Sequence, residues 1–288
     1  DIATEIASRD FPVVFTGGGD GTFVQFVNDY ADRQPKAMPN IGVIPLGTGN
    51  AIASIVSSGN YECDLRSYVD RRHRDTQLLQ LVESEGSRFP FGGLGWDAEI
   101  LNDYVAIKKS FGQAPLLGKM VQNAGGYLAA FFGRTMPRNF ARKISGKAVR
   151  NEVRITNLGK EAHALYGGNA VKAYGPGDVL YEGPTNITMF GTAPYYGSGF
   201  SALPYSMNRT GSFQLRVVTM GMGKIVSNLR SIWKGRYVGP DIMDWHANHV
   251  KMEFSNAIPY QYGGDAQGYR DSVELKLSPT TVDLLRFI

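Results

Sequence analysis

The sequence predicts an α/β nucleotide-binding domain with a parallel sheet, followed by a mostly β, sandwich-like second domain. Glycine-rich strand-to-helix turns occur twice in the first 50 residues, and alternating β-rich segments dominate after about residue 74. The 288 residues exceed the usual size of one domain, and the 43% hydrophobic content is normal for a globular protein. We therefore expect an α/β domain over residues 1–74 and a β-rich domain over residues 75–288, whose C-terminal end could return to the first domain.

The first domain begins with two similar units. Phe11–Phe15 predicts a short buried strand that runs into Gly17–Gly19 before apolar residues resume at helical spacing. Ile41–Leu46 predicts another strand, followed by the turn Gly47–Asn50 and the apolar helix start Ala51–Val56. Two consecutive strand–turn–helix units indicate a parallel sheet.

The second domain is predicted to contain strands and two helices. Turns rich in Gly, Pro and Asn separate β-rich segments such as Gln77–Val82, Val149–Asn157, Thr185–Phe190 and Phe213–Val218. Apolar residues at helical spacing predict helices over Leu116–Phe132 and Gly223–Trp233. The apolar stretch Pro115–Gly133 is interrupted by polar residues, so we predict no transmembrane helix there.

Composition limits the partners and the compartment. The net charge of +4 and the pI near 9.0 come from only 19% charged residues, which favours anionic ligands but not a nucleic-acid partner. Residues 1–10 lack the pattern of a secretory signal, and Cys63 alone cannot form an internal disulfide. We expect a cytoplasmic protein; the sequence does not indicate an oligomeric state.

The strongest chemical signal is Gly17-Gly18-Gly19-Asp20-Gly21-Thr22, between a strand and a helix. Glycines at such a turn let backbone N–H groups approach phosphate oxygens, and the helix N-terminus adds partial positive charge. Asp20 would repel phosphate unless it binds Mg²⁺ or accepts a proton from an attacking hydroxyl. A single turn of this kind is as often only a tight connection.

A second turn strengthens the prediction of a nucleotide site. Pro45-Leu46-Gly47-Thr48-Gly49-Asn50 also follows a strand and precedes a helix. Both turns would lie at the carboxyl ends of the sheet, where open α/β folds bind ligands. Thr48 and Asn50 can donate hydrogen bonds to phosphate or ribose oxygens.

These two turns together resemble the nucleotide motifs of the diacylglycerol kinase catalytic-domain family, whose relatives include sphingosine and ceramide kinases. The resemblance continues through Gly93–Glu99, similar to the family's glycine-aromatic-Asp segment, and Ala193–Gly199, similar to its Tyr-Gly-Gly loop. It implies a nucleotide domain, a β-sandwich domain, and a cleft for ATP and lipid between them. It also implies peripheral contact with a membrane surface that presents the lipid.

The resemblance implies a role for each matching residue. Gly18, Gly19, Gly21 and Thr22 would line the phosphates, and Gly47, Thr48, Gly49 and Asn50 would line the rest of the nucleotide. Asp20 would hold Mg²⁺ or activate the lipid hydroxyl. Asp97 matches an acid associated with the polar head of the lipid, although a helix-capping role is the alternative.

The sequence departs from the family at three places. The usual Asp-Gly-Glu is replaced near the C-terminal end by Asp265-Ala266-Gln267, and glutamine cannot act as a base. Proton transfer would then fall to Asp265 or Asp20, or activity would be slow or absent. Pro204–Gly211 lacks the acidic loop that can hold a structural Mg²⁺, and only ten residues precede Phe11, which predicts an incomplete wall of the nucleotide site.

The function that we expect is ATP- and Mg²⁺-dependent phosphorylation of a lipid hydroxyl, with diacylglycerol the first choice and a sphingoid base or ceramide the alternatives. A kinase for a soluble acceptor, as in NAD kinases, and a non-catalytic lipid-binding protein remain open.

Aromatic and basic residues interleave over Tyr127–Lys143, the pattern of an interfacial anchor, with buried packing as the alternative. His246 and His249 could share a helix face but make a poor zinc site, and Arg71–Arg74 is typical of an exposed linker.

Overall fold

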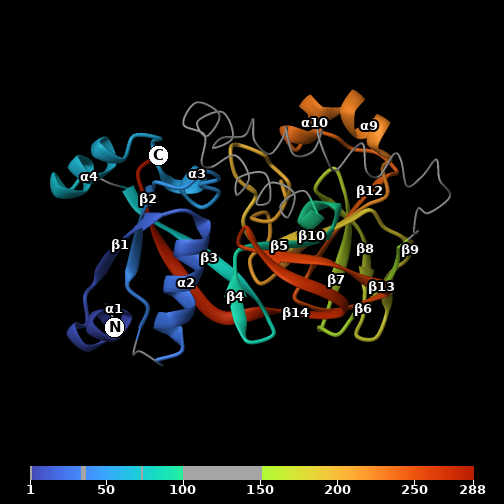
Figure 1. The fold of residues 1–288 in the computed structure, drawn as a ribbon, viewed down its shortest axis with the longest axis horizontal. Helices are drawn as coiled ribbons and strands as arrows, with labels where there is room; N and C mark the ends of the chain where they lie inside the picture. Colours follow the sequence, from blue (N-terminus) through green and yellow to red (C-terminus); the bar gives the residue numbers. More distant parts are fainter. Residues whose placement is uncertain (1, 34–36, 73, 100–150) are drawn as a thin grey trace, which may run out of the picture.

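The computed structural model describes residues 2–33, 37–72, 74–99 and 151–288, and the first part of the chain forms a small α/β unit (Figure 1). Strands β1 and β2 pair in parallel, with Gly18 of β1 aligned with Pro45 of β2. The helix between them buries an apolar face that includes Phe23, Val27 and Tyr30, at the spacing of helical turns. The elements of this unit are α1 (Ile2–Arg9), β1 (Val13–Gly18), α2 (Asp20–Ala31), β2 (Asn40–Pro45), α3 (Ala53–Val56) and α4 (Tyr61–Val69).

The second part of the described chain is dominated by antiparallel strands, as the sequence predicts. Strand β11 has the predicted bounds, and the predicted strands near residues 77, 149 and 185 are also present within a few residues. The strands are β3 (Arg74–Ser84), β4 (Ser87–Phe89), β5 (Phe91–Gly95), β6 (Glu152–Asn157), β7 (Ala162–Tyr166), β8 (Asn169–Tyr174), β9 (Val179–Pro184), β10 (Ile187–Gly191), β11 (Phe213–Val218), β12 (Ile242–Ala247), β13 (His249–Tyr262) and β14 (Asp265–Arg286).

One sheet runs through both parts of the molecule. Its main path has the order β1-β2-β14-β13-β5-β10-β11-β12-β7-β8, and β3, β4, β6 and β9 branch from it. The last strand, β14, pairs in parallel with β2 at Leu284 and Ile41, and antiparallel with β3 and β13. In Figure 1 β14 is the red strand that runs from the α/β unit into the β-rich part. The predicted fold class is therefore confirmed, and the two parts share a sheet and a hydrophobic core.

Two predictions about local structure need correction. The helical segment predicted over Gly223–Trp233 is divided at Asn228 into α9 (Met222–Ser227) and α10 (Leu229–Trp233). His246 and His249 lie on strands β12 and β13 and not on one helix, because the segment that carries them pairs with neighbouring strands of the sheet. A separation of three residues places two side chains on one face in a helix but not in a strand, so the spacing alone gave a wrong prediction.

Some predictions lie outside the described residues, namely the helix over 116–132, the interfacial segment 127–143 and the apolar stretch 115–133. In the part of the chain that the structure describes, no helix has the length and apolar character needed to cross a membrane. The described residues also contain no cluster of three or more His, Cys, Asp or Glu side chains that could hold a metal ion.

Candidate active site

The two glycine-rich turns meet at the carboxyl ends of β1 and β2. The backbone N–H groups of Leu46 and Gly47 both donate to the carbonyl oxygen of Gly18, at 3.1 and 3.0 Å. A Cβ on Gly47 would overlap the backbone of Gly19, so only glycine permits this approach. The two turns therefore form one continuous backbone surface, as the sequence predicts for a phosphate cradle.

Asp20 fastens the second turn to the first. Its two carboxylate oxygens accept hydrogen bonds from the backbone N–H groups of Ala51 and Ile52, both at 3.0 Å. Burial raises the pKa of Asp20, and these two hydrogen bonds oppose that rise. This positioning contact was not predicted from the sequence. The roles of Asp20 as Mg²⁺ ligand or proton acceptor stay predictions.

Asn50 closes the second turn. It adopts a left-handed conformation with φ of 52°, and its side-chain amide donates to the carbonyl oxygen of Gly47 at 2.7 Å. Its side-chain oxygen accepts from the N–H of Gly47 at 3.0 Å. The Asn50 amide therefore shapes the turn, while its predicted contact with a nucleotide is untested.

In the first turn, Thr22 packs directly against Gly18.

The loop 193–199 covers the second turn. The N–H of Ser198 donates to the carbonyl oxygen of Gly49 at 2.7 Å, and the Ser198 hydroxyl donates to the carbonyl oxygen of Thr48 at 3.4 Å. Gly197 has a φ of 122°, and a Cβ there would lie 2.8 Å from the Cα of Gly49. The neighbouring Tyr196 donates its hydroxyl to the carbonyl oxygen of Gly92. This loop thus joins the second glycine-rich turn to the strand that precedes Asp97.

Asp97 is a half-buried acid within a short helical segment, residues 96–99, that follows β5. Its Oδ2 atom accepts a hydrogen bond from Nε2 of Gln261 at 2.6 Å. Burial raises the pKa of Asp97 to about 6, and the bond from Gln261 acts in the opposite direction. The charge of this carboxylate also affects Tyr196. Burial raises the pKa of the Tyr196 phenol well above its usual value, and the negative charge of Asp97 adds to the rise.

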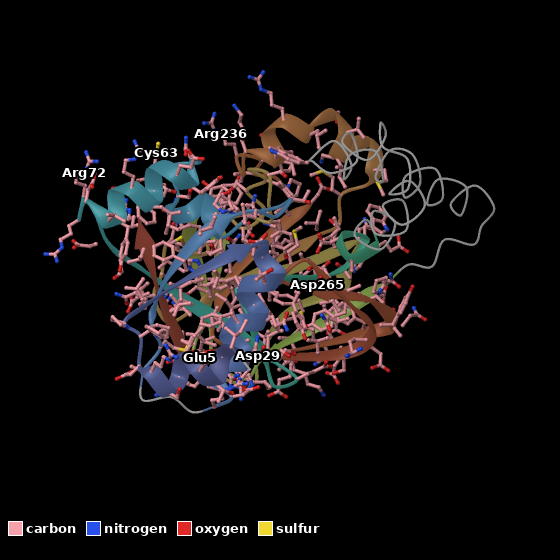
Figure 2. The ribbon with its side chains drawn as sticks, turned by 60° about the vertical axis from the view of Figure 1, so that its left-hand side comes forward. Glu5, Asp29, Cys63, Arg72, Arg236 and Asp265 are labelled. Carbon is pink, nitrogen blue, oxygen red and sulfur yellow. The ribbon has the colours of Figure 1, made fainter. Side chains whose placement is uncertain are left out.

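Asp265 reaches the first glycine turn from the other end of the chain. It begins β14 directly after a tight turn at Gly263 and Gly264, and it pairs with Tyr262 of β13. A Cβ on Gly21 would lie only 2.8 Å from the Oδ2 atom of Asp265, so this carboxylate rests against the first turn of α2. Figure 2 shows the exposed Asp265 beside the start of that helix.

Gln267 lies two residues further along the same strand. Its Nε2 donates to the backbone carbonyl of Asp265 at 3.4 Å, and its own carbonyl accepts from Arg270 at 3.0 Å. Arg270 in turn holds Glu85 through two contacts of 2.6 and 2.8 Å. The structure therefore brings the Asp265 carboxylate to Gly21 in the first glycine turn, whereas the described contacts of Gln267 are with its own strand.

Gln261 is a site residue that sequence reasoning missed. Besides donating to Asp97, it accepts a hydrogen bond from the N–H of Gly264 at 3.3 Å, and it is only 3% exposed. It thereby links the half-buried acid to the turn that presents Asp265. The one available signal was a glutamine between two aromatic residues, in the run Tyr260-Gln261-Tyr262.

A buried ion pair was also missed. Arg216 of β11 donates to both carboxylate oxygens of Asp244 on β12, at 2.7 and 2.9 Å, and to the carbonyl oxygen of Ala202 at 2.7 Å. Gln214 donates to the same carboxylate and accepts from the N–H of Tyr205. This network fixes residues 202–205, which follow the loop 193–199. Its signal was the presence of Gln214 and Arg216 among the apolar residues of β11.

Comparisons with known proteins give a family match for the first part of the chain and a shared fold for nearly all of it. Residues 1–81 match the family described as the diacylglycerol kinase catalytic domain. No curated protein sequence matches the chain. The solved structure "A putative diacylglycerol kinase from Bacillus anthracis str. Sterne" is 20% identical with a TM-score of 0.64, over 99% of this chain and 81% of that one. Another, "The crystal structure of a diacylglycerol kinases from Bacillus anthracis str. Sterne", is 16% identical with a TM-score of 0.57, over 98% and 79%.

These findings confirm the resemblance to the diacylglycerol kinase catalytic-domain family, with the family match itself covering residues 1–81. At 16–20% identity the solved structures show a common fold, including the β-rich second part. Neither comparison assigns a role to an individual residue of this chain.

Proposed function

We propose, from the match of residues 1–81 to the diacylglycerol kinase catalytic domain, that this protein transfers the γ-phosphate of ATP to the hydroxyl of a membrane lipid. Diacylglycerol is the first candidate for the acceptor, and a sphingoid base or ceramide is the alternative. The observation that carries the proposal is the contact of the Asp265 carboxylate with Gly21 of the first glycine-rich turn, because a proton acceptor is needed beside the phosphates in this reaction.

The glycine turns are proposed to hold ATP. The backbone of Gly18–Thr22 and Gly47–Asn50 would line the phosphates and the rest of the nucleotide, and side chains at Gly19 or Gly47 would obstruct this surface. Oxygen ligands suit Mg²⁺, and each Asp20 oxygen keeps a lone pair beyond the N–H bond that it accepts, so this carboxylate fits the ion. When bound with ATP, Mg²⁺ would neutralise charge on the phosphates.

The acceptor hydroxyl would be held and deprotonated by two separate carboxyl groups. Asp97, half-buried and held by Gln261, would accept a hydrogen bond from the polar head of the lipid. As the acceptor oxygen attacks the γ-phosphorus, Asp265 would take the hydroxyl proton, and the bond to the β-phosphate oxygen would break. Backbone N–H groups of the turns would stabilise the charge on the transferring phosphoryl group. Gln267 cannot take this proton.

The proposal is tested by measuring phosphorylated product with ATP, Mg²⁺ and separate acceptors: dioctanoylglycerol, sphingosine, ceramide and NAD. We expect lipid phosphorylation, a loss of about 10²-fold or more in Asp265→Asn, and preserved or higher activity in Gln267→Glu. The matched control is Asp271→Asn, which removes an exposed carboxylate from the same strand and should change turnover less than twofold.

Each alternative result has a definite meaning. Phosphorylation of NAD alone would identify a kinase for a soluble acceptor. Lipid binding without ATP consumption would identify a non-catalytic lipid-binding protein. Normal turnover in Asp265→Asn would remove Asp265 as proton acceptor and leave Asp20 in that role.

A further inference from the structure

A basic pocket lies on the paired helices α9 and α10, away from the glycine turns. Its volume is about 390 Å³. Three of its residues are cations, three are small and polar, and none is acidic: Ser227, Asn228, Arg230, Ser231, Lys234 and Arg236 line it. Guanidinium, ammonium, hydroxyl and amide groups together provide the donors that a phosphate group binds.

The positive charge of this pocket is not neutralised by the part of the chain that the structure describes. Within those residues, the side chains of Arg230, Lys234 and Arg236 form no ion pair or hydrogen bond, whereas nearby Lys224 is paired with Asp241. Figure 2 shows Arg236 extending from the surface at the upper edge of the view. An anion entering the pocket would therefore meet cations that have no described competing partner.

Exposed apolar residues flank the pocket-lining segment in the sequence, since Val226 precedes Ser227 and Val238 is two residues beyond Arg236. No residue of α9 or α10 is buried, and Val226 and Val238 are 37% and 45% exposed. A free phosphate ion would need only the polar groups, whereas a lipid surface offers phosphate and hydrocarbon side by side. The combination of cations and exposed apolar residues is complementary to an anionic bilayer.

The pocket is physically connected to the candidate active site. Trp233 of α10 stacks on Phe200, with ring centroids 5.1 Å apart, and the N–H of Ser201 donates to the carbonyl oxygen of Trp233 at 2.9 Å. Phe200 follows the loop whose Ser198 N–H donates to Gly49. In Figure 1, α9 and α10 lie at the top of the β-rich part, and α3, which follows the second glycine turn, lies in the upper half of the picture.

We propose that the α9–α10 pocket binds the phosphate-bearing headgroup of an anionic lipid and docks this edge of the protein on the bilayer that supplies the acceptor. The inference rests on the proposed function for its biological meaning, but its test does not require catalysis. The headgroup is a docking ligand and not the phosphorylated acceptor.

The test compares vesicles of phosphatidylcholine alone with vesicles that also contain about 30 mol% phosphatidylglycerol. The second kind carries the negative surface charge of an anionic membrane. The variant carries Arg230→Gln, Lys234→Gln and Arg236→Gln. The matched control neutralises three exposed cations elsewhere, Arg66→Gln, Lys160→Gln and Lys172→Gln, and therefore has the same net charge. Vesicle affinity is measured by co-sedimentation at two salt concentrations, with circular dichroism as the check on folding.

We expect the wild-type protein to bind anionic vesicles more tightly than neutral ones, and the pocket variant to lose on the order of 100-fold in affinity, since each basic residue near an anionic surface contributes about fivefold. The control should lose less than about fivefold. Equal losses in the two triple variants would overturn the proposal, because net charge alone would then explain binding. Wild-type binding that is indifferent to phosphatidylglycerol would also overturn it.

Two further arms separate the source of the anion and the dependence on catalysis. Inorganic phosphate, compared with chloride at equal ionic strength, should not displace the wild-type protein from vesicles; displacement lost in the pocket variant would identify a free-phosphate site instead. Phosphorylation of micellar dioctanoylglycerol should be equal in wild type and pocket variant. Absence of this activity in both would refute the proposed function while leaving the vesicle result to decide the docking site.

Discussion

The substitution Asp97→Asn is expected to make the folded protein more stable at alkaline pH while weakening the proposed reaction. Burial raises the pKa of this carboxyl from the ordinary value of 3.8 to about 6. A pKa difference of about 2 units between the folded and unfolded states corresponds to a free-energy difference of about 3 kcal/mol between the two protonation states. The asparagine oxygen can still accept the hydrogen bond from Gln261, so the main change is removal of a half-buried negative charge.

The sign follows from the direction of the shift. Because the pKa of Asp97 is higher in the folded than in the unfolded state, its favourable contribution is complete below pH 3.8 and is lost as the pH rises through about 6. At pH 8 the wild-type protein should therefore be about 3 kcal/mol less stable than Asp97→Asn. The difference should fall to about half at pH 5 and vanish near pH 3.

Urea unfolding of both proteins at pH 8, 6.5 and 5 measures this difference, with lipid phosphorylation recorded at each pH. Asp29→Asn is the control, because Asp29 is an exposed carboxylate on α2 (Figure 2), and it should change the free energy of unfolding by less than about 0.5 kcal/mol. An Asp97→Asn protein that is less stable than wild type at pH 8 would refute the reasoning, since the charged carboxylate would then be net stabilising.

Three further predictions test contacts within the site. Gln261→Met should raise the pKa of Asp97 by about 1–2 units, because a hydrogen bond to a charged group contributes about 1.5–3 kcal/mol. The acidic side of the pH profile of kcat/KM should then move to higher pH. An unchanged profile in a folded variant would contradict this role of Gln261. Gly49→Val should weaken ATP binding about tenfold or more in calorimetry, since a Cβ would lie 3.1 Å from Asp20 and 3.6 Å from Gly197; unchanged affinity contradicts the cradle. Asp20→Ala should lower the free energy of unfolding by about 2–4 kcal/mol, because two backbone N–H groups lose their acceptor, and an unchanged urea midpoint would exclude that role.

The parts of the fold that could be predicted are those with strong local patterns. The strand–glycine–helix pattern before α2 and α3 depends on neighbouring residues, so it is readable from a short window of sequence. Strand β11 was predicted with its full bounds because a β-rich run is limited by turn residues. Helix α1 was not predicted, since eight residues with a mixed pattern give a weak signal.

The contacts that complete the candidate site were beyond the sequence because they join distant segments. Asp97 and Gln261 are separated by 164 residues, and the pairing of β13 with β5, the strand that precedes Asp97, brings them together. The family resemblance selected Asp20, Asp97 and Asp265 as functional candidates, but it gave no information on what each carboxylate contacts. Asp20 in particular was expected to face a ligand, whereas its described hydrogen bonds hold the beginning of the next helical segment.

The pairing of β14 with β2 has a consequence for how the chain reaches its native state. Ile41 lies near one end of the sequence and Leu284 near the other, so during synthesis on a ribosome β2 lacks this neighbour until nearly all the residues between them have been added. Closing so long a loop is entropically costly, and topologies with many distant pairings fold slowly. The nascent α/β unit would meanwhile present an unpaired strand edge, the kind of surface that chaperones protect from aggregation.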